Sequence, residues 1–150
     1  MLKVTVMDTE AGLTTTRPTL SRARARRLVD AAAREAEAIS VAVTIVTVDE
    51  SGVLKEMCRM DGAPLVSVQT ALSKAYAAAA IGMPPDDFYA AIKSDAAAVA
   101  SFATRPGLAL IGGGMPVMAA GQVAGAMTAA EDRRIAEAAV SRAGGEQASR

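Results

Sequence analysis

The sequence predicts a mixed α/β (α+β) domain in which an antiparallel sheet of about five strands carries flanking helices. Residues 41–48 are almost wholly β-branched, and residues 53–60 return after the turn 49–52, which predicts a β-hairpin. Alanine-rich segments with helical spacing of their apolar residues lie on either side of this hairpin. Short apolar segments separated by glycine then predict further strands before a last helix.

The first half of the domain follows an N-terminal extension. Residues 1–18 are polar and threonine-rich in their second part, and residues 3–7 could form an edge strand. Thr19 is a suitable N-cap for a helix over residues 20–39. The strand at residues 41–48 is apolar on both faces, which predicts a central strand covered on both sides.

The elements of the second half are predicted from the glycine, proline and capping residues that separate them. Helices are expected at residues 67–80, 85–93, from a cap at 94–95 to 102, and 129–142. Strands are expected at residues 108–111, 115–119 and 122–128. Asp86 and Asp87 fall in the first turn of their helix, where the helix dipole favours carboxylates, so catalysis is not needed to account for them. Residues 144–150 are expected to form a disordered tail.

Composition narrows the range of partners. The 150 residues are enough for one domain with its own core. Sixteen basic residues balance sixteen acidic ones and only 3% of residues are aromatic, so neither nucleic acid nor an anionic membrane is an expected partner. The single cysteine, Cys58, excludes an internal disulfide. The sequence shows no secretory signal pattern and no apolar run long enough to span a bilayer, so we expect a cytoplasmic protein.

The chain contains no histidine. A Ser-His-Asp or Cys-His mechanism is therefore impossible, and no metal site is expected. Haem is disfavoured as a cofactor for the same reason, because histidine is its usual axial ligand. The residues that could replace histidine on haem iron are Met57, Met60, Met115, Met118, Tyr76 and Cys58.

Charged groups gather where the hairpin meets the next helix. Arg59 and Asp61 follow the returning strand, and Lys74 and Tyr76 lie in the helix after it. Opposite charges at element ends form either a binding site or a structural ion network. Gly112, Gly113 and Gly114 allow close approach of a ligand to the backbone, although a purely structural turn is the favoured explanation for them.

An ordered set of motifs resembles a known family. The motifs are Thr19-Leu20, Val41-Ala42-Val43, Val48-Asp49-Glu50-Ser51-Gly52, Arg59-Met60-Asp61-Gly62-Ala63-Pro64, Ser73-Lys74-Ala75-Tyr76, Thr104-Arg105-Pro106-Gly107 and Gly112-Gly113-Gly114-Met115-Pro116. Together, over residues 19–143, they resemble the GlcG/HbpS family of haem-binding or "haem-degrading" domains, which includes the PduO C-terminal domain.

The resemblance implies a profilin-like sandwich that assembles into dimers, hexamers or octamers, and in some members binds haem or a corrinoid-related ligand. It places the family's polar positions on Arg59, Asp61, Lys74 and the turn at Arg105. The family's loop after the last strand is shortened here, since residues 125–132 run almost directly from strand to helix.

Three functions are compatible with these residues. In the first, a binding protein holds haem or another carboxylate-bearing metabolite with Arg59, Met60, Lys74, Arg105 and the three glycines. In the second, a cofactor-independent lyase, isomerase, cyclase or hydratase uses Asp61 and Lys74 as acid and base and Tyr76 as proton donor, with Arg59 or Arg105 as anchor. In the third, the protein is an oligomeric accessory protein without a ligand.

Overall fold

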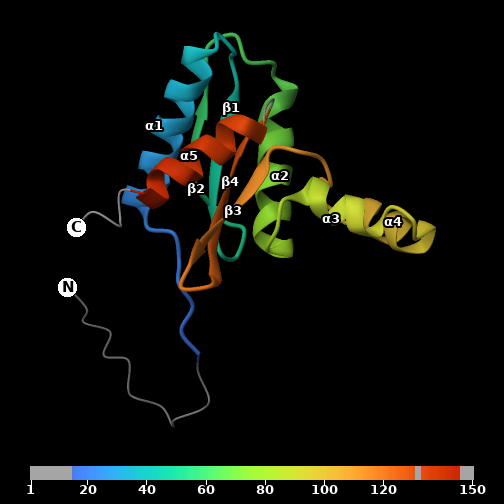
Figure 1. The fold of residues 1–150 in the computed structure, drawn as a ribbon. Helices are drawn as coiled ribbons and strands as arrows, with labels where there is room; N and C mark the ends of the chain where they lie inside the picture. The colour runs from blue at the N-terminus through green and yellow to red at the C-terminus, as the bar shows by residue number, and fades with distance from the viewer. Residues whose placement is uncertain (1–14, 131–132, 146–150) are drawn as a thin grey trace, which may run out of the picture.

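The computed structural model describes residues 15–130 and 133–145 (Figure 1). The helices are α1 (Arg22–Ala38), α2 (Val66–Ile81), α3 (Pro85–Ile92), α4 (Ala96–Ala103) and α5 (Arg133–Gly145). The strands are β1 (Thr44–Asp49), β2 (Leu54–Arg59), β3 (Gly114–Ala119) and β4 (Gln122–Ala129). All pairings are antiparallel, in the order β2-β1-β4-β3.

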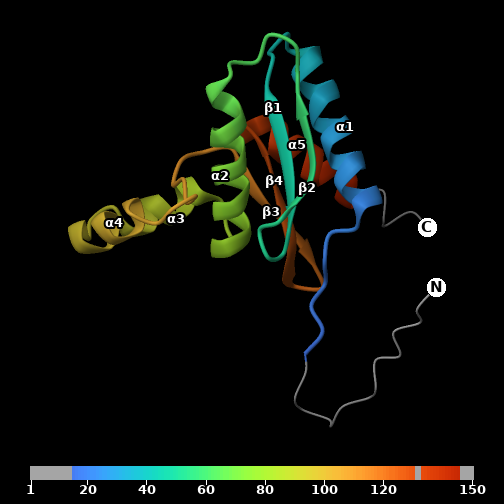
Figure 2. The same cartoon turned by 180° about the vertical axis from the view of Figure 1, so that it is seen from behind.

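The sheet lies between two helical layers, with α1 and α5 on one face and α2 on the other (Figures 1 and 2). Alternate residues of β1 supply both cores, as the pattern of residues 41–48 predicts. On one side, Val43 and Ile45 pack with the apolar faces of α1 and α5. On the other, Val46 and Val48 pack against α2. The predicted central strand covered on both sides is therefore confirmed.

Alanine brings α2 very close to the sheet. The helix turns Ala71, Ala75 and Ala78 inward, and all three are fully buried. A Cβ on Gly114, at the start of β3, would lie 2.6 Å from the carbonyl oxygen of Lys74. The helix ends at Gly82, whose φ of 80° is the left-handed geometry that glycine favours at a C-cap.

The start of α1 corrects one prediction. Thr19 is not the N-cap: Ser21 caps the helix and accepts a hydrogen bond from the Arg24 amide at 3.2 Å. The chain before the cap is held by the sheet instead, because the Leu20 amide donates to the Ala124 carbonyl at 2.7 Å. This bond ties residue 20 to β4, and Ser21 follows it in an extended conformation, with φ −67° and ψ 151°. The helix therefore begins two residues later than the expected start at residue 20.

The strand expected at residues 108–111 was also wrong, and the described sheet has four strands rather than about five. Pairing of β3 with β4 begins only at Gly114, opposite Thr128. Because β4 ends one residue later, the residues before Gly114 have no neighbouring strand to pair with. The edge strand suggested for residues 3–7 and residues 146–150 of the expected tail lie outside the described residues. Residues 144–145 of that tail instead belong to α5, which runs to Gly145 rather than ending at residue 142.

The end of β4 differs slightly from the prediction. β4 runs to Ala129 instead of ending at residue 128, and the Ala130 amide still donates to the Thr44 carbonyl at 2.9 Å. Helix α5 begins at Arg133 rather than at residue 129. The short helices α3 and α4 form an arm that projects from the body (Figure 1). Within the arm, the Phe88 and Phe102 rings meet edge to face at 5.0 Å.

No described helix is long and apolar enough to cross a bilayer.

We predict that Gly125→Ala strongly destabilises the fold. A Cβ at this position of β4 would lie 2.3 Å from the Val48 carbonyl oxygen and 3.0 Å from the Leu20 Cβ. Overpacking of this kind costs about 3 kcal/mol. Gly121→Ala is the matched control, because a Cβ built there meets no atom within 4 Å apart from its chain neighbours. Its φ of 75° should cost an alanine only about 1 kcal/mol. Urea unfolding measures both, and equal losses would contradict the packing described here.

Candidate functional site

Helix α2 separates the predicted site residues onto its two flanks. Lys74 and Tyr76 are two positions apart, which places them about 200° apart around the helix. Lys74 faces the start of β3 and the end of β4. Tyr76 faces the turn between β1 and β2, where its ring lies over Gly52. The side chains of Lys74 and Tyr76 therefore lie in different environments, on opposite flanks of α2.

The Lys74 flank contains the glycine run. Lys74 is only 6% exposed, and its ammonium donates a hydrogen bond to the Ala130 carbonyl. A Cβ on Gly113 would lie 3.3 Å from Lys74 Nζ and 3.0 Å from the Ala129 carbonyl oxygen. The Gly113 carbonyl in turn accepts from the Thr128 hydroxyl at 2.8 Å. The structure thus brings Lys74 and the glycines together, in a tightly packed contact between helix and sheet.

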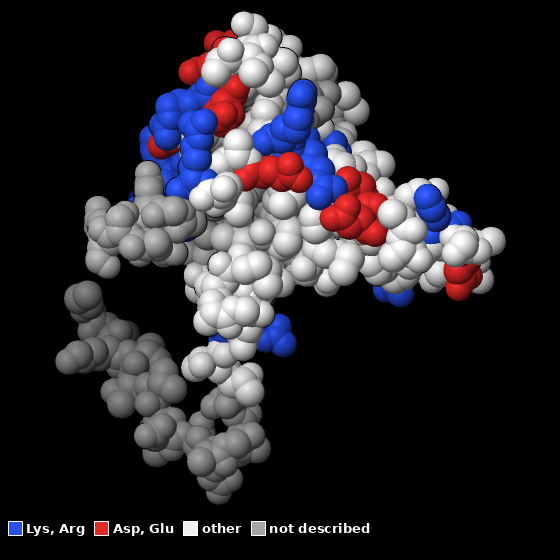
Figure 3. Space-filling model, in the orientation of Figure 1, with Lys and Arg blue, Asp and Glu red and all other residues white. Residues whose placement is uncertain are grey.

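An ion network borders the glycine run. Arg133 Nη1 lies 2.6 Å from Asp86 Oδ2 and 3.0 Å from Asp87 Oδ1, while its Nε lies 2.6 Å from Glu137 Oε1. Figure 3 shows basic and acidic atoms meeting between α5 and α3. Gly112 lies beside the same network, because a Cβ there would come 3.4 Å from Asp86 Oδ2.

Hydrogen bonds within this network favour the charged forms of Asp87 and Arg133. The bonds from Arg133 lower the pKa of Asp87, and the carboxylates of Asp87, Glu137 and Asp86 raise the pKa of Arg133. Helix position alone had accounted for the two aspartates in the sequence. Their pairing with Arg133 was missed because it joins residues 46 and 47 positions apart, and no local pattern reports such a contact. A guanidinium that already binds three carboxylates is poorly suited to hold a further anion.

The other flank is an uncovered part of the sheet. Thr44 lies opposite Arg59, Val46 opposite Met57, and Val48 opposite Leu54. Partners across a ladder share a face of the sheet. Leu54, Met57 and Arg59 therefore lie on the α2 side. Helix α2 packs on β1, β3 and β4, leaving Leu54 47% and Met57 42% exposed. We call Leu54, Met57 and Arg59 the open β2 face. Figure 2 shows β2 at the edge of the sheet, next to β1.

A hollow of about 200 Å³ lies at the turn end of this face. Its lining residues come from the β1–β2 turn, α2 and the loop after α4: Val48, Gly52, Gln69, Leu72, Ser73, Tyr76, Pro106 and Gly107. Tyr76 and the turn that follows Arg105 thus meet at one place. The Arg105 guanidinium itself lies over the Phe102 ring, 5.2 Å from its centroid.

The remaining predicted residues lie at the far end of β2. Arg59 Nη2 donates to the Ala63 carbonyl at 2.5 Å, which holds an otherwise exposed side chain. Met60 packs against the core on the α1 side of the sheet. Asp61 is exposed, and its side chain forms no ion pair or hydrogen bond with the described residues. No described contact joins Asp61 to Lys74.

Metal-ligating side chains do not gather in the part of the chain that the structure describes: no group of three His, Cys, Asp or Glu residues could hold a metal ion there.

Comparison with known families gives a clear match. The model of a family described as haem-degrading, HbpS-like proteins matches residues 20–141. An uncharacterised 15.0 kDa protein of Citrobacter freundii, encoded between dhaT and dhaS, is 30% identical over 128 residues, covering 81% of this chain and 90% of the relative.

Solved structures show the same fold. Klebsiella pneumoniae protein ORFY has a TM-score of 0.83 at 24% identity, over 91% of this chain and 98% of that one. HbpS has a TM-score of 0.76 at 25% identity, over 94% and 98%. The PduOC complex with haem has a TM-score of 0.74 at 24% identity, over 82% and 94%.

We predict that Arg133→Met makes stability less dependent on pH. The folded-state pKa of Asp87 lies below its ordinary value of 3.8, so the network's stabilisation is present above that value and is lost as pH falls through the lowered pKa. Acidification to pH ~2 should lower the melting temperature of the wild type. At pH 7 the variant should melt a few degrees below the wild type, but its melting temperature should fall less on acidification.

Arg26→Met is the matched control, because the one ion pair of Arg26 with a described residue is the exposed pair with Asp30 at 3.9 Å. If the melting temperatures of wild type and Arg133→Met fell equally across this pH range, the role of the network would be contradicted.

Proposed function

This chain belongs to the family of HbpS-like haem-degrading proteins, and we propose that it binds a small carboxylate-bearing molecule, with haem as the first candidate, on the open β2 face. One observation carries the proposal. The sheet face that α2 leaves uncovered presents two apolar side chains followed by an arginine.

This arrangement has the two parts that such a ligand needs. Leu54 and Met57 offer apolar surface, whose burial contributes about 25 cal/mol per Å². Arg59 lies at the end of the same face, and a guanidinium binds a carboxylate through paired hydrogen bonds. Its bond to the Ala63 carbonyl uses one nitrogen and leaves the other donors for a ligand. From Leu54 to Arg59 the strand extends roughly 17 Å, which is long enough for a planar ligand.

Haem would take its iron ligand from the same side. Met57 is 42% and Tyr76 40% exposed, and both methionine and tyrosine ligate haem iron in proteins. Cys58 and Met60 pack toward the α1 side of the sheet, which makes them less suitable. The PduOC structure holds haem in a similar fold, and this supports haem as the first ligand to test.

Binding is favoured over acid–base catalysis by the positions of Asp61 and Lys74. A cofactor-independent reaction of the predicted kind needs both groups at one substrate. Here Asp61 is exposed in the loop before α2, while Lys74 is buried against the glycine run. Lys74 is therefore assigned to holding α2 against the end of β4, and Arg59 to the ligand.

The proposal also leaves room for a second copy of the chain. Helix α4 buries none of its residues, and Leu65 and Val66 at the start of α2 are 79% and 72% exposed. Exposed apolar surface of this kind is typical of protein interfaces. The expected homo-oligomer, from dimer to octamer, would bury such surface and could close the open β2 face over its ligand.

We predict that hemin binds saturably, with a shift of its Soret band, and that Arg59→Gln weakens binding by about tenfold. The expected loss corresponds to one charge-assisted contact with a propionate. Met57→Leu and Tyr76→Phe keep the apolar surface but remove one candidate iron ligand each, so one of them should change the spectrum. Absorbance titration measures all variants.

Arg34→Gln is the matched control, because Arg34 is an exposed arginine on α1 that forms no ion pair with the described residues. Absence of saturable binding by the wild type would rule out haem. Wild-type affinity and spectrum in all three site variants would place any haem elsewhere on the molecule.

A further inference from the structure

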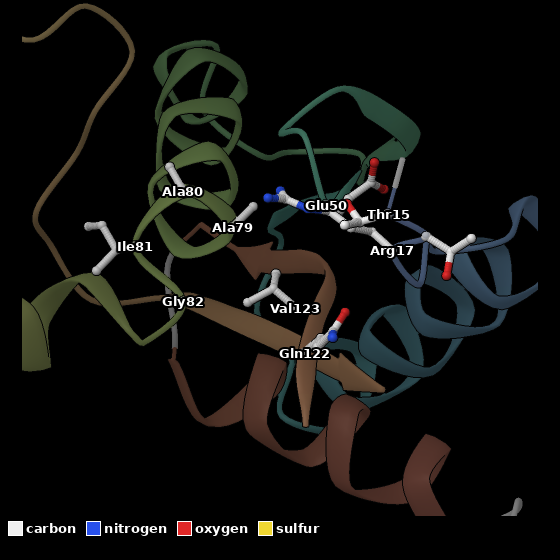
Figure 4. A pocket seen from close by; sticks show the side chains of 10 residues that line it. Thr15, Arg17, Glu50, Ala79, Ala80, Ile81, Gly82, Gln122 and Val123 are labelled. Carbon is white, nitrogen blue, oxygen red and sulfur yellow. The ribbon is translucent and has the colours of Figure 1, made fainter. Parts of the chain in front are cut away.

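A second hollow lies away from the open β2 face, at the C-terminal end of α2. It measures about 610 Å³. Four separate segments meet there: the chain before α1, the β1–β2 turn, the end of α2 and the start of β4 (Figure 4). The lining residues are Thr15, Thr16, Arg17, Glu50, Ala79, Ala80, Ile81, Gly82, Gln122 and Val123.

Arg17 supplies the positive charge of this hollow. Figure 4 shows its guanidinium extending into the space beside the last turns of α2. The side chain forms no ion pair or hydrogen bond with any other described residue. Its five N–H donors therefore remain for a bound group, and a carboxylate matches their planar arrangement best.

Glu50 supplies the negative charge. Its Oε1 accepts a hydrogen bond from the Ser51 hydroxyl at 3.0 Å, whereas its Oε2 is shielded from solvent and accepts no hydrogen bond of good geometry from the described residues. The nearby Thr19 hydroxyl, the amide of Glu50 itself and the Ser51 hydroxyl lower the pKa of this carboxyl. Glu50 is thus a carboxylate at neutral pH. Its Oε1 accepts only one described hydrogen bond, from Ser51, and a carboxylate oxygen can accept a second donor.

The two charges share one hollow but do not pair with each other, since no ion pair joins Arg17 and Glu50. Two opposite charges held apart in a concave site are complementary to a molecule that carries both signs. Ala79 and Val123 point toward Arg17 and provide apolar wall for a side chain (Figure 4).

We propose that this hollow binds a small zwitterion of the free amino-acid class, with its carboxylate on Arg17, its ammonium on Glu50, and an apolar side group against Ala79 and Val123. The site is separate from the open β2 face, so this inference does not rest on the proposed function.

Isothermal titration of the full chain with L-leucine tests the proposal. Leucinamide lacks the carboxylate and 4-methylpentanoate lacks the ammonium, so each isolates one charge of the ligand. L-leucine should bind saturably, and each analogue should bind at least tenfold more weakly. Arg17→Gln should weaken L-leucine at least tenfold and abolish its advantage over leucinamide. Glu50→Gln should do the same relative to 4-methylpentanoate.

Arg22 is an exposed arginine at the start of α1 that forms no ion pair within the described part of the chain, so Arg22→Gln should bind L-leucine as the wild type does. If Glu50→Gln lowers the melting temperature through the β1–β2 turn, the Arg17→Gln comparison decides, because residue 17 precedes the folded helix. The proposal is overturned if the wild type shows no saturable binding of L-leucine, or if Arg17→Gln leaves both affinity and discrimination unchanged.

Discussion

The close approach of α2 to the sheet is the constraint on which the rest of the structure depends. Three buried alanines let the helix approach so closely that β3 must begin with glycine, because a Cβ on Gly114 would come 2.6 Å from the Lys74 carbonyl oxygen. The same approach places the Lys74 ammonium on the Ala130 carbonyl. Because α2 is centred over β1, β3 and β4, it leaves one face of β2 without cover. The position of α2 thus produces a closely packed flank at Lys74 and an open flank at β2.

Most of the fold could be predicted from local patterns. The β-branched run around Ile45 and the alanine spacing of α2 depend on burial within each element, and both are confirmed. The errors fall where pairing between distant segments decides the structure. Leu20 is hydrogen-bonded to β4, so Ser21 rather than Thr19 caps α1. Residues 108–111 are apolar enough for a strand but have no partner strand in the described sheet.

The candidate site could be predicted only in part. The sequence shows that Arg59, Lys74 and Tyr76 lie close to one another along the chain, but it does not report the direction in which each points. The helical turn between Lys74 and Tyr76 sends them to opposite flanks of α2. The ion network at Arg133 and the hollow at Arg17 remained hidden for a related reason, because each assembles side chains from segments far apart in sequence.

The central claim is that the open β2 face is where a haem-like ligand binds, and mapping the contact by NMR tests it most directly. Gallium protoporphyrin is a diamagnetic substitute for haem, so resonances near it stay observable. Titration into labelled protein should shift the signals of Leu54, Met57, Arg59 and Tyr76 together, with one saturation curve. Shifts confined to the α1 and α5 face of the sheet, or to the glycine run beside Lys74, would contradict the account.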